Sequence, residues 1–328
     1  MNVRLARRPS RRLISSTTVA ASTVLGLVGL SACSSSSSAD SKNDGKLDVV
    51  ASFYPMQYLA EQIGGDHVSV SNLTEPGQEP HDLEVSAKQR AQIEESDVAL
   101  HLKGLQPAVD EAIDQSGTQT KIDAASLTSL EKHGSEVGGH AEEHAEEDGH
   151  DHDSEGSDPH IWLDPVKYTE VAEGVGKALE KADPDHAADY KKNTTALVKK
   201  LDDLNTKFED GLKNTGSKTF ITTHAAFGYL AERYGLTEEA ISGLDPESEP
   251  SAARVKDLQK MAKADGVTTV FYETLVSDKT AKTLASDAKL KTDVLDPIEG
   301  ITDKSKGDDY LQVMESNLAA LQKALGAK

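Results

Sequence analysis

The chain has 328 residues, enough for two domains of ordinary size. It carries 35 Lys and Arg residues against 56 Asp and Glu residues, so its net charge at pH 7 is -21. This surplus of acid excludes nucleic acid and anionic lipid surfaces as partners of the folded part.

The N-terminus is typical of an export signal. Five arginines up to Arg12 precede an apolar run from about Val19 to Leu30, which is too short to be a permanent membrane helix. Leu-Ser-Ala-Cys then resembles a bacterial lipobox, so we expect a lipoprotein signal peptide over residues 1–32 and lipidation at Cys33. The alternative is a plain signal peptide with a free thiol. The choice between general and twin-arginine export stays open.

The next segments predict a tether and a first lobe. Residues 33–46 are rich in Ser, Asp and Lys, which indicates a flexible tether. The first lobe is expected over residues 47–165, where strand and helix patterns alternate as in a parallel, doubly wound α/β sheet. Strands are expected at 47–53, 68–74, 98–104 and 120–126, and helices at 56–65, 86–97 and 107–117.

An acidic, histidine-rich run interrupts this order in a loop predicted to be disordered over residues 133–157. Its histidines come in two pairs, His140 with His144 and His150 with His152, separated by glutamates and aspartates. Neutral imidazoles bind zinc, and carboxylates raise the local cation concentration. We expect weak, exchangeable metal capture here. The alternative is a disordered insertion without a measurable role.

The following segment, DPHIWLDP, contains the only tryptophan and places His160 among apolar residues and prolines. It predicts one wall of a binding site. Residues 166–215 then read as interlobe helices, since a long amphipathic helix follows a break at Pro184.

A second lobe is expected over residues 216–328, where strand and helix patterns alternate again. The predicted fold class is therefore α/β, with two doubly wound lobes of the (βα)4 type joined by a long rigid helix. The expected strands lie at 219–224, 238–242, 268–273 and 291–296, and a closing helix lies at 308–326.

Four metal-type side chains fall near the ends of these elements. Ligands of open α/β sheets bind beyond the carboxyl ends of strands. His224 and Asp296 end two strands, His81 lies in a strand-to-helix loop, and His160 lies in the proline-braced wall. Three imidazoles and one carboxylate in the cleft between the lobes would suit zinc.

Each of these residues also has a structural reading. A lone histidine is usually a surface or capping residue, and Asp296 before a proline is typical of a turn. Other polar residues are interpreted as structural: the aspartates as helix caps or partners of ligands, and the histidines as structural or solvated. They are Asp82, Asp158, Asp164, His67, His101, His133 and His186.

From about Leu47 onward the chain resembles the metal-receptor group of ABC-transporter substrate-binding proteins, specifically the zinc-uptake lipoproteins. The segments that carry this resemblance are SFYPMQYLAEQIGGD, EPGQEPHDLEVSAKQ, DPHIWLDP, ITTHAAFGYLAERYGL, TVFYETLVS, VLDPIEG and DDYLQVMESNL. The resemblance implies metal ligands at His81, His160, His224 and Asp296. It also implies a monomer held outside the cytoplasm by a lipid anchor, with an ABC permease as partner and Zn²⁺ as cargo.

Alternatives remain within and outside this family. Manganese receptors of the group tend to carry a carboxylate where His224 stands, so zinc is favoured, although Mn²⁺ or Cd²⁺ could compete. A zinc hydrolase would need an open coordination position and a general base, and the sequence has no HExxH motif. A surface adhesin or zinc buffer is the remaining alternative.

Overall fold

The computed structural model describes residues 45–137 and 157–327. Several expectations lie outside these residues: the signal peptide, most of the tether, Cys33, and the four histidines His140, His144, His150 and His152. Within the described ranges, no helix is both long and apolar enough to cross a membrane.

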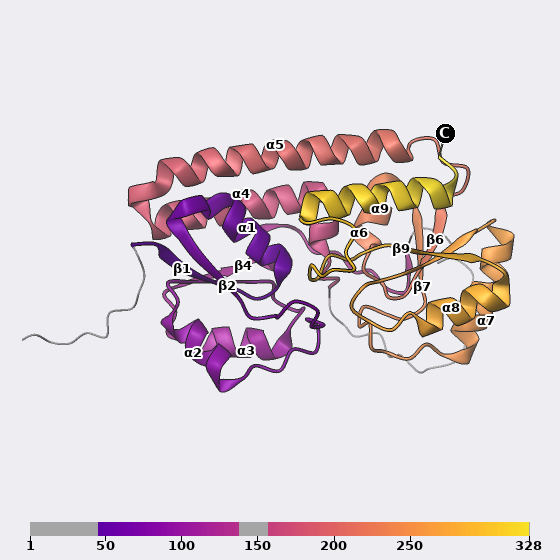
Figure 1. Cartoon of the computed structure of the whole chain (residues 1–328), viewed down its shortest axis with the longest axis horizontal. Helices are drawn as coiled ribbons and strands as arrows, with labels where there is room; N and C mark the ends of the chain where they lie inside the picture. The colour runs from indigo at the N-terminus through magenta and orange to yellow at the C-terminus, as the bar shows by residue number, and fades with distance from the viewer. Residues whose placement is uncertain (1–44, 138–156, 328) are drawn as a thin grey trace, which may run out of the picture. The chain divides into compact units, whose positions relative to one another are not determined.

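Two mainly parallel sheets form two α/β lobes, as the sequence predicts (Figure 1). The first sheet has the order β2-β1-β3-β4 and the second the order β5-β7-β6-β8-β9. The four parallel strands of each lobe therefore follow the same order: second, first, third, fourth. Their bounds are Leu47–Ala51 (β1), Val68–Asn72 (β2), Val98–His101 (β3), Thr120–Asp123 (β4), Thr219–Thr222 (β6), Thr237–Ala240 (β7), Thr269–Tyr272 (β8) and Lys291–Val294 (β9).

The short strand β5 (Glu136–Val137) corrects two predicted boundaries. It pairs antiparallel with β7, where Glu136 faces Glu239. Residues 136–137 therefore belong to the second sheet, whereas the sequence assigned them to the first lobe and to a disordered loop.

Nine α-helices surround the sheets in the described ranges. Their ends follow local signals: Ser86 and Gln89 form a capping box at α2, and Asp164 caps α4 directly before Pro165. The helices are α1 (Tyr54–Gly64), α2 (Ala87–Glu95), α3 (Pro107–Gln115), α4 (Pro165–Ala182), α5 (Ala187–Leu212), α6 (Gly228–Tyr234), α7 (Ala252–Ala264), α8 (Lys279–Ala288) and α9 (Tyr310–Leu325).

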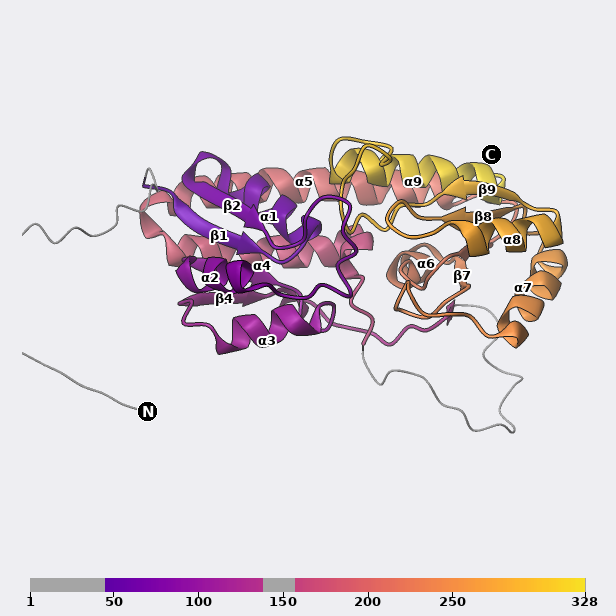
Figure 2. The same ribbon diagram turned by 60° about the horizontal axis from the view of Figure 1, so that its bottom comes forward.

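Helix α5 runs along both lobes (Figures 1 and 2). Its 26 residues span roughly 39 Å at about 1.5 Å per residue. Near its start, Asn193 donates a hydrogen bond to the carbonyl oxygen of Ile63 in α1. Near its end, the carbonyl oxygen of Gly211 accepts one from Gln322 in α9. One continuous helix is therefore fixed to the first lobe and to the second.

The hydrophobic core has a shared layer and two local layers. A single cluster of buried side chains runs from β1 and α1 through α4 and α5 to α6 and α9. The opposite face of each sheet has its own cluster, under α2 and α3 in the first lobe and under α7 and α8 in the second. Consecutive residues of β1 show the division, because Val49 joins the shared cluster and Val50 the local one.

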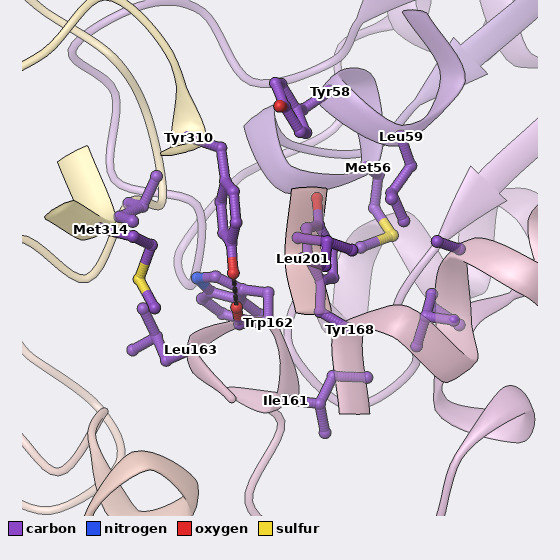
Figure 3. Close-up of a cluster of buried hydrophobic side chains, with 14 of the residues drawn as sticks. Met56, Tyr58, Leu59, Ile161, Trp162, Leu163, Tyr168, Leu201, Tyr310 and Met314 are labelled. Carbon is purple, nitrogen blue, oxygen red and sulfur yellow. Dashed lines mark hydrogen bonds between the residues drawn. The ribbon is translucent and has the colours of Figure 1, made fainter. Parts of the chain in front are cut away.

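Trp162 lies where the two lobes meet in the shared layer (Figure 3). Its ring packs edge-on against Phe53, with centroids 4.9 Å apart. The Tyr310 hydroxyl donates to the Trp162 carbonyl oxygen at 2.5 Å. The Trp162 indole N–H donates to the carbonyl oxygen of Pro297 at 2.7 Å. The tryptophan thus contacts β1-side residues of the first lobe and two segments of the second.

We expect Leu201→Ala in α5 to lower the free energy of unfolding by about 2–5 kcal/mol, because it leaves a cavity in the shared layer. The exposed Lys192→Ala in the same helix should change it by less than about 0.5 kcal/mol. Urea denaturation of both variants measures the difference. Equal effects would contradict the role of α5 as the common support.

Candidate metal centre

Three histidines and one glutamate converge between the lobes. His81 lies in the loop from β2 to α2, and His160 directly precedes the short 3-10 helix Ile161–Leu163. His224 lies two residues after β6, and Glu299 lies five residues after β9. One ligand-type atom from each of the four lies within 4.8 Å of all the others. The structure therefore brings together all three histidines that the sequence predicts.

Four of the six distances among these ligand atoms are close to those of tetrahedral coordination. Glu299 Oε1 lies 3.3 Å from His81 Nε2, 3.6 Å from His160 Nε2 and 3.5 Å from His224 Nε2. The Nε2 atoms of His160 and His224 are 3.4 Å apart. Ligand atoms of a tetrahedral zinc ion lie about 3.3–3.4 Å apart, because Zn–N distances are about 2.0–2.1 Å. The four side chains fit such an ion with little movement.

Two buried carboxylates orient the imidazoles. His160 Nδ1 lies 2.7 Å from Asp158 Oδ1, and His224 Nδ1 lies 2.9 Å from Glu273 Oε1. An Nδ1–H that donates to a carboxylate leaves the lone pair on Nε2, which is the arrangement of metal-binding histidines. The His81 backbone N–H donates to Glu79 Oε1 at 2.9 Å, which fixes the start of its loop.

The site is rich in buried, uncompensated carboxylate oxygens. Among the described residues, the Oε2 atoms of Glu79, Glu273 and Glu299 are buried without a hydrogen-bond partner. Burial of such atoms is costly unless a cation or proton compensates them. Burial and the neighbouring Glu299 raise the pKa of Glu79 to about 9. The donor set therefore fits a divalent cation.

His160 and His224 bind protons at the same Nε2 atoms that would bind a metal. Burial alone lowers the pKa of His224, but the charge and hydrogen bond of Glu273 outweigh it and raise that pKa well above its ordinary value. Asp158 likewise raises the pKa of His160 against the effect of burial. Burial opposes the ionisation of Glu299, yet hydrogen bonds from the three imidazoles hold its pKa well below the usual range. Protons and a metal ion compete for the Nε2 positions.

The carboxylate of this group is Glu299 and not Asp296. Asp296 instead supports the turn before Glu299: its Oδ1 accepts the Ile298 N–H at 2.8 Å, and its Oδ2 accepts the Thr274 hydroxyl at 3.2 Å. Its backbone N–H donates to Asn317 Oδ1 at 2.9 Å. Burial raises the pKa of Asp296 to about 6.

Glu299 is not predicted from the sequence, because an unusual backbone conformation precedes it. Ile298 is left-handed with φ 59°, which is rare for a β-branched residue. The turn redirects the chain, so the residue three positions after Asp296 enters the site. The motif VLDPIEG contains both acids, but the strand-end rule selects the first.

Several of the aspartates and histidines interpreted as structural have partners. Asp164 caps α4 and pairs with Arg233 at 2.6 Å. His101 lies 2.9 Å from Asp110. Rings of His67 and His186 stack with centroids 4.0 Å apart.

Comparison with known proteins also points to a zinc-binding protein. The sequence matches the family described as zinc-uptake complex component A, periplasmic (ZnuA), over residues 49–324. The chain belongs to this family. The high-affinity zinc uptake system protein ZnuA of Bacillus subtilis is 38% identical to it over 309 residues, which cover 91% of this chain and 94% of that protein.

Streptococcal proteins are similar as well. The zinc-binding lipoprotein AdcA of Streptococcus pneumoniae is 38% identical over 299 residues, 89% of this chain, and the match spans 58% of AdcA. This chain therefore corresponds to little more than half of that relative. The Zn(II)-bound ZnuA-like domain of AdcA superposes with a TM-score of 0.70 at 34% identity, covering 86% of this chain and 99% of that domain.

The geometry of this ZnuA-family chain suits holding a cation. Three imidazoles and one carboxylate fill four tetrahedral positions, whereas a catalytic zinc keeps one position open for water. Side-chain exposure is 0% for His160 and Glu299, 2% for His224 and 11% for His81. A cation would therefore enter and leave beside His81.

We expect Asp296→Ala to lower the free energy of unfolding of the metal-free protein by about 1–3 kcal/mol, because the buried Ile298 N–H loses its acceptor. The exposed Asp287→Ala in α8 is the control and should have little effect. Thermal and urea unfolding measure both. An unaffected Asp296→Ala protein would contradict the structural role of this carboxylate.

Proposed function

We propose that this chain is the zinc receptor of an ABC importer. It captures Zn²⁺ outside the cytoplasm and passes it to a membrane permease. The observation that carries the proposal is that Glu299 Oε1 lies 3.3–3.6 Å from the Nε2 atoms of His81, His160 and His224, with all four ligand atoms within 4.8 Å of one another. The names of its relatives, a zinc-binding lipoprotein and a high-affinity zinc uptake protein, support the same cargo.

The ligand set favours zinc over harder cations. Manganese prefers more oxygen ligands, whereas imidazole is a borderline donor that suits zinc. Cadmium, which is softer, is the expected competitor. Asp158 holds the His160 ring and Glu273 holds the His224 ring, so both imidazoles keep the orientation that binds zinc.

Release of the cargo involves loops more than lobes. The shared core and the continuous helix α5 oppose a large hinge motion. His81 is the most exposed ligand and lies on the connection between β2 and α2. In this proposal the permease lowers the affinity by displacing that loop.

The expected surroundings complete the proposal. The signal peptide over residues 1–32 directs export, lipidation at Cys33 anchors the protein, and the tether over residues 33–46 lets the folded part reach the permease. The receptor acts as a monomer and binds its cargo without enzymatic turnover. The domains are the first lobe, the interlobe helices over 166–215 and the second lobe over 216–328.

Glu299→Gln should weaken Zn²⁺ binding by at least about a hundredfold, more than the loss of an outer partner usually causes, because it removes the charged ligand. Asp296→Asn keeps an acceptor for Ile298 and should change the affinity by less than about tenfold. Competitive titration with a chelating dye measures both. The reverse ranking would restore Asp296 as the ligand.

Transport provides the test in the cell. The unaltered protein should restore growth of a deletion strain under zinc limitation, and Glu299→Gln should not. Growth restored equally by both would show that the site does not serve uptake. A deletion strain that grows normally without zinc supplements would point to a buffer or adhesin.

Zinc affinity should fall as the pH is lowered, beginning above 6.5, the ordinary pKa of imidazole. The sign follows from the raised pKa values of His160 and His224: below them each imidazole holds a proton that Zn²⁺ must displace. Titrations between about pH 5 and about pH 8 measure the profile. Glu273→Gln should move its onset to lower pH, because it removes the charge that raises the His224 pKa. An onset at or below 6.5 in the unaltered protein would contradict this account.

A further inference from the structure

A second group of metal-type side chains lies away from the four ligands. It consists of Glu131, His133 and Glu232, and one ligand-type atom from each lies within 4.8 Å of the other two. Glu131 and His133 lie before β5, and Glu232 lies on α6. Two carboxylates and an imidazole this close concentrate negative charge at one point.

His133 is built into the fold and is not a solvated side chain. Only 7% of its side chain is exposed, and its ring packs edge-on against Tyr229 with centroids 4.6 Å apart. Its Nδ1 lies 2.7 Å from Asp158 Oδ2. Gly228 makes room for the ring, since a Cβ at that position would lie 2.6 Å from His133 Cγ. The imidazole therefore has one fixed orientation.

Asp158 orients His133, the outer imidazole, in the same way as His160, the inner imidazole of the four-ligand centre. Its Oδ1 is bound to His160 Nδ1 and its Oδ2 to His133 Nδ1. When both Nδ1–H groups donate to Asp158, both Nε2 atoms carry lone pairs. The inner Nε2 faces Glu299, and the outer Nε2 faces Glu232 Oε2 at 3.2 Å.

A lone pair and a carboxylate oxygen at this distance repel unless a proton or a metal ion lies between them. Asp158 Oδ2 and Glu232 Oε2 lie beside the two opposite ring nitrogens of His133, at 2.7 Å and 3.2 Å. The position is thus suited to a cation of either kind. A divalent ion would also compensate Glu131, whose present partner is Lys167 at 2.9 Å.

We propose that Glu131, His133 and Glu232 form a second site for a divalent cation of the zinc type. It shares no ligand with the inner centre, and Asp158 is the outer partner of both. Binding here is weaker than at the inner centre, because Glu232 is exposed and Glu131 must leave Lys167. The site does not depend on the proposed transport function.

The test counts the zinc ions bound by the full-length chain when the histidines of the acidic run can no longer bind zinc. His140, His144, His150 and His152 are all changed to Gln, and Zn²⁺ is titrated by equilibrium dialysis with metal analysis. Two ions per chain are expected. Adding His133→Gln should leave one.

The matched control is His101→Gln. His101 is also a buried imidazole with an aspartate at Nδ1, since it lies 2.9 Å from Asp110, but it belongs to neither group. This variant should still bind two ions. Loss of the second ion in His101→Gln would show that the effect of His133→Gln is a general loss of structure and would overturn the assignment.

Glu232→Gln supplies a second, milder variant. Its side chain is 56% exposed, so the fold should be unaffected, and it leaves the contact between His133 and Asp158 in place. The weaker zinc affinity should fall about tenfold or more, while the stronger one stays unchanged. An unchanged weaker affinity, or two ions retained after His133→Gln, would overturn the proposal.

The two proposals fail separately in the same assay. Glu299→Gln should remove the strong ion and keep the weak one if the outer site exists. Retention of both ions in Glu299→Gln, with the strong affinity unchanged, would contradict the inner ligand set and not the outer one.

Discussion

The indole N–H of Trp162 donates a buried hydrogen bond to the carbonyl oxygen of Pro297, and the site depends on this contact. Trp162 lies two residues after His160, and Pro297 lies two residues before Glu299. The bond therefore ties together the segments that carry two of the four ligands, one from each side of the cleft. Tyr310 holds the carbonyl of the same tryptophan, and Phe53 packs on its ring. A tryptophan buried in this way has a partner for its only polar atom, which makes the junction both tight and specific.

The lobes supply the remaining geometry by repeating one plan. Each has four parallel strands in the same order, and His81, His224 and Glu299 lie on connections that follow β2, β6 and β9. The shared hydrophobic layer and α5 hold the two lobes in a fixed arrangement. Asp158 and Glu273 contact the Nδ1 atoms of His160 and His224, and these contacts fix the directions of the two Nε2 atoms. The rigid core and these carboxylates together thus fix where the ligand atoms point.

Much of this arrangement could be predicted from the sequence, and the exceptions have physical reasons. Alternating strand and helix patterns predicted both lobes. They also placed His224 at the end of a strand and His81 in a strand-to-helix loop, as the structure has them, whereas His160 was predicted from its proline-braced segment. Glu299 could not be found this way, because the left-handed Ile298 and its hydrogen bond to Asp296 form a turn that strand and helix periodicity does not show. The strand β5 has only two residues, too few for any periodicity. His133 was interpreted as structural or solvated, since its contacts with Asp158 and α6 join residues far apart in the chain.

At Ile298 the backbone conformation and the core packing favour different side chains. Its left-handed φ of 59° favours glycine, whereas its complete burial in the shared core favours a large apolar group. Glycine would relax the backbone and leave a hole beside the Asp-Pro turn. A straight-chain residue would fill the hole less well. Few amino acids are therefore acceptable next to Glu299. Substitution of Ile298 is constrained, although Ile298 itself offers no ligand atom.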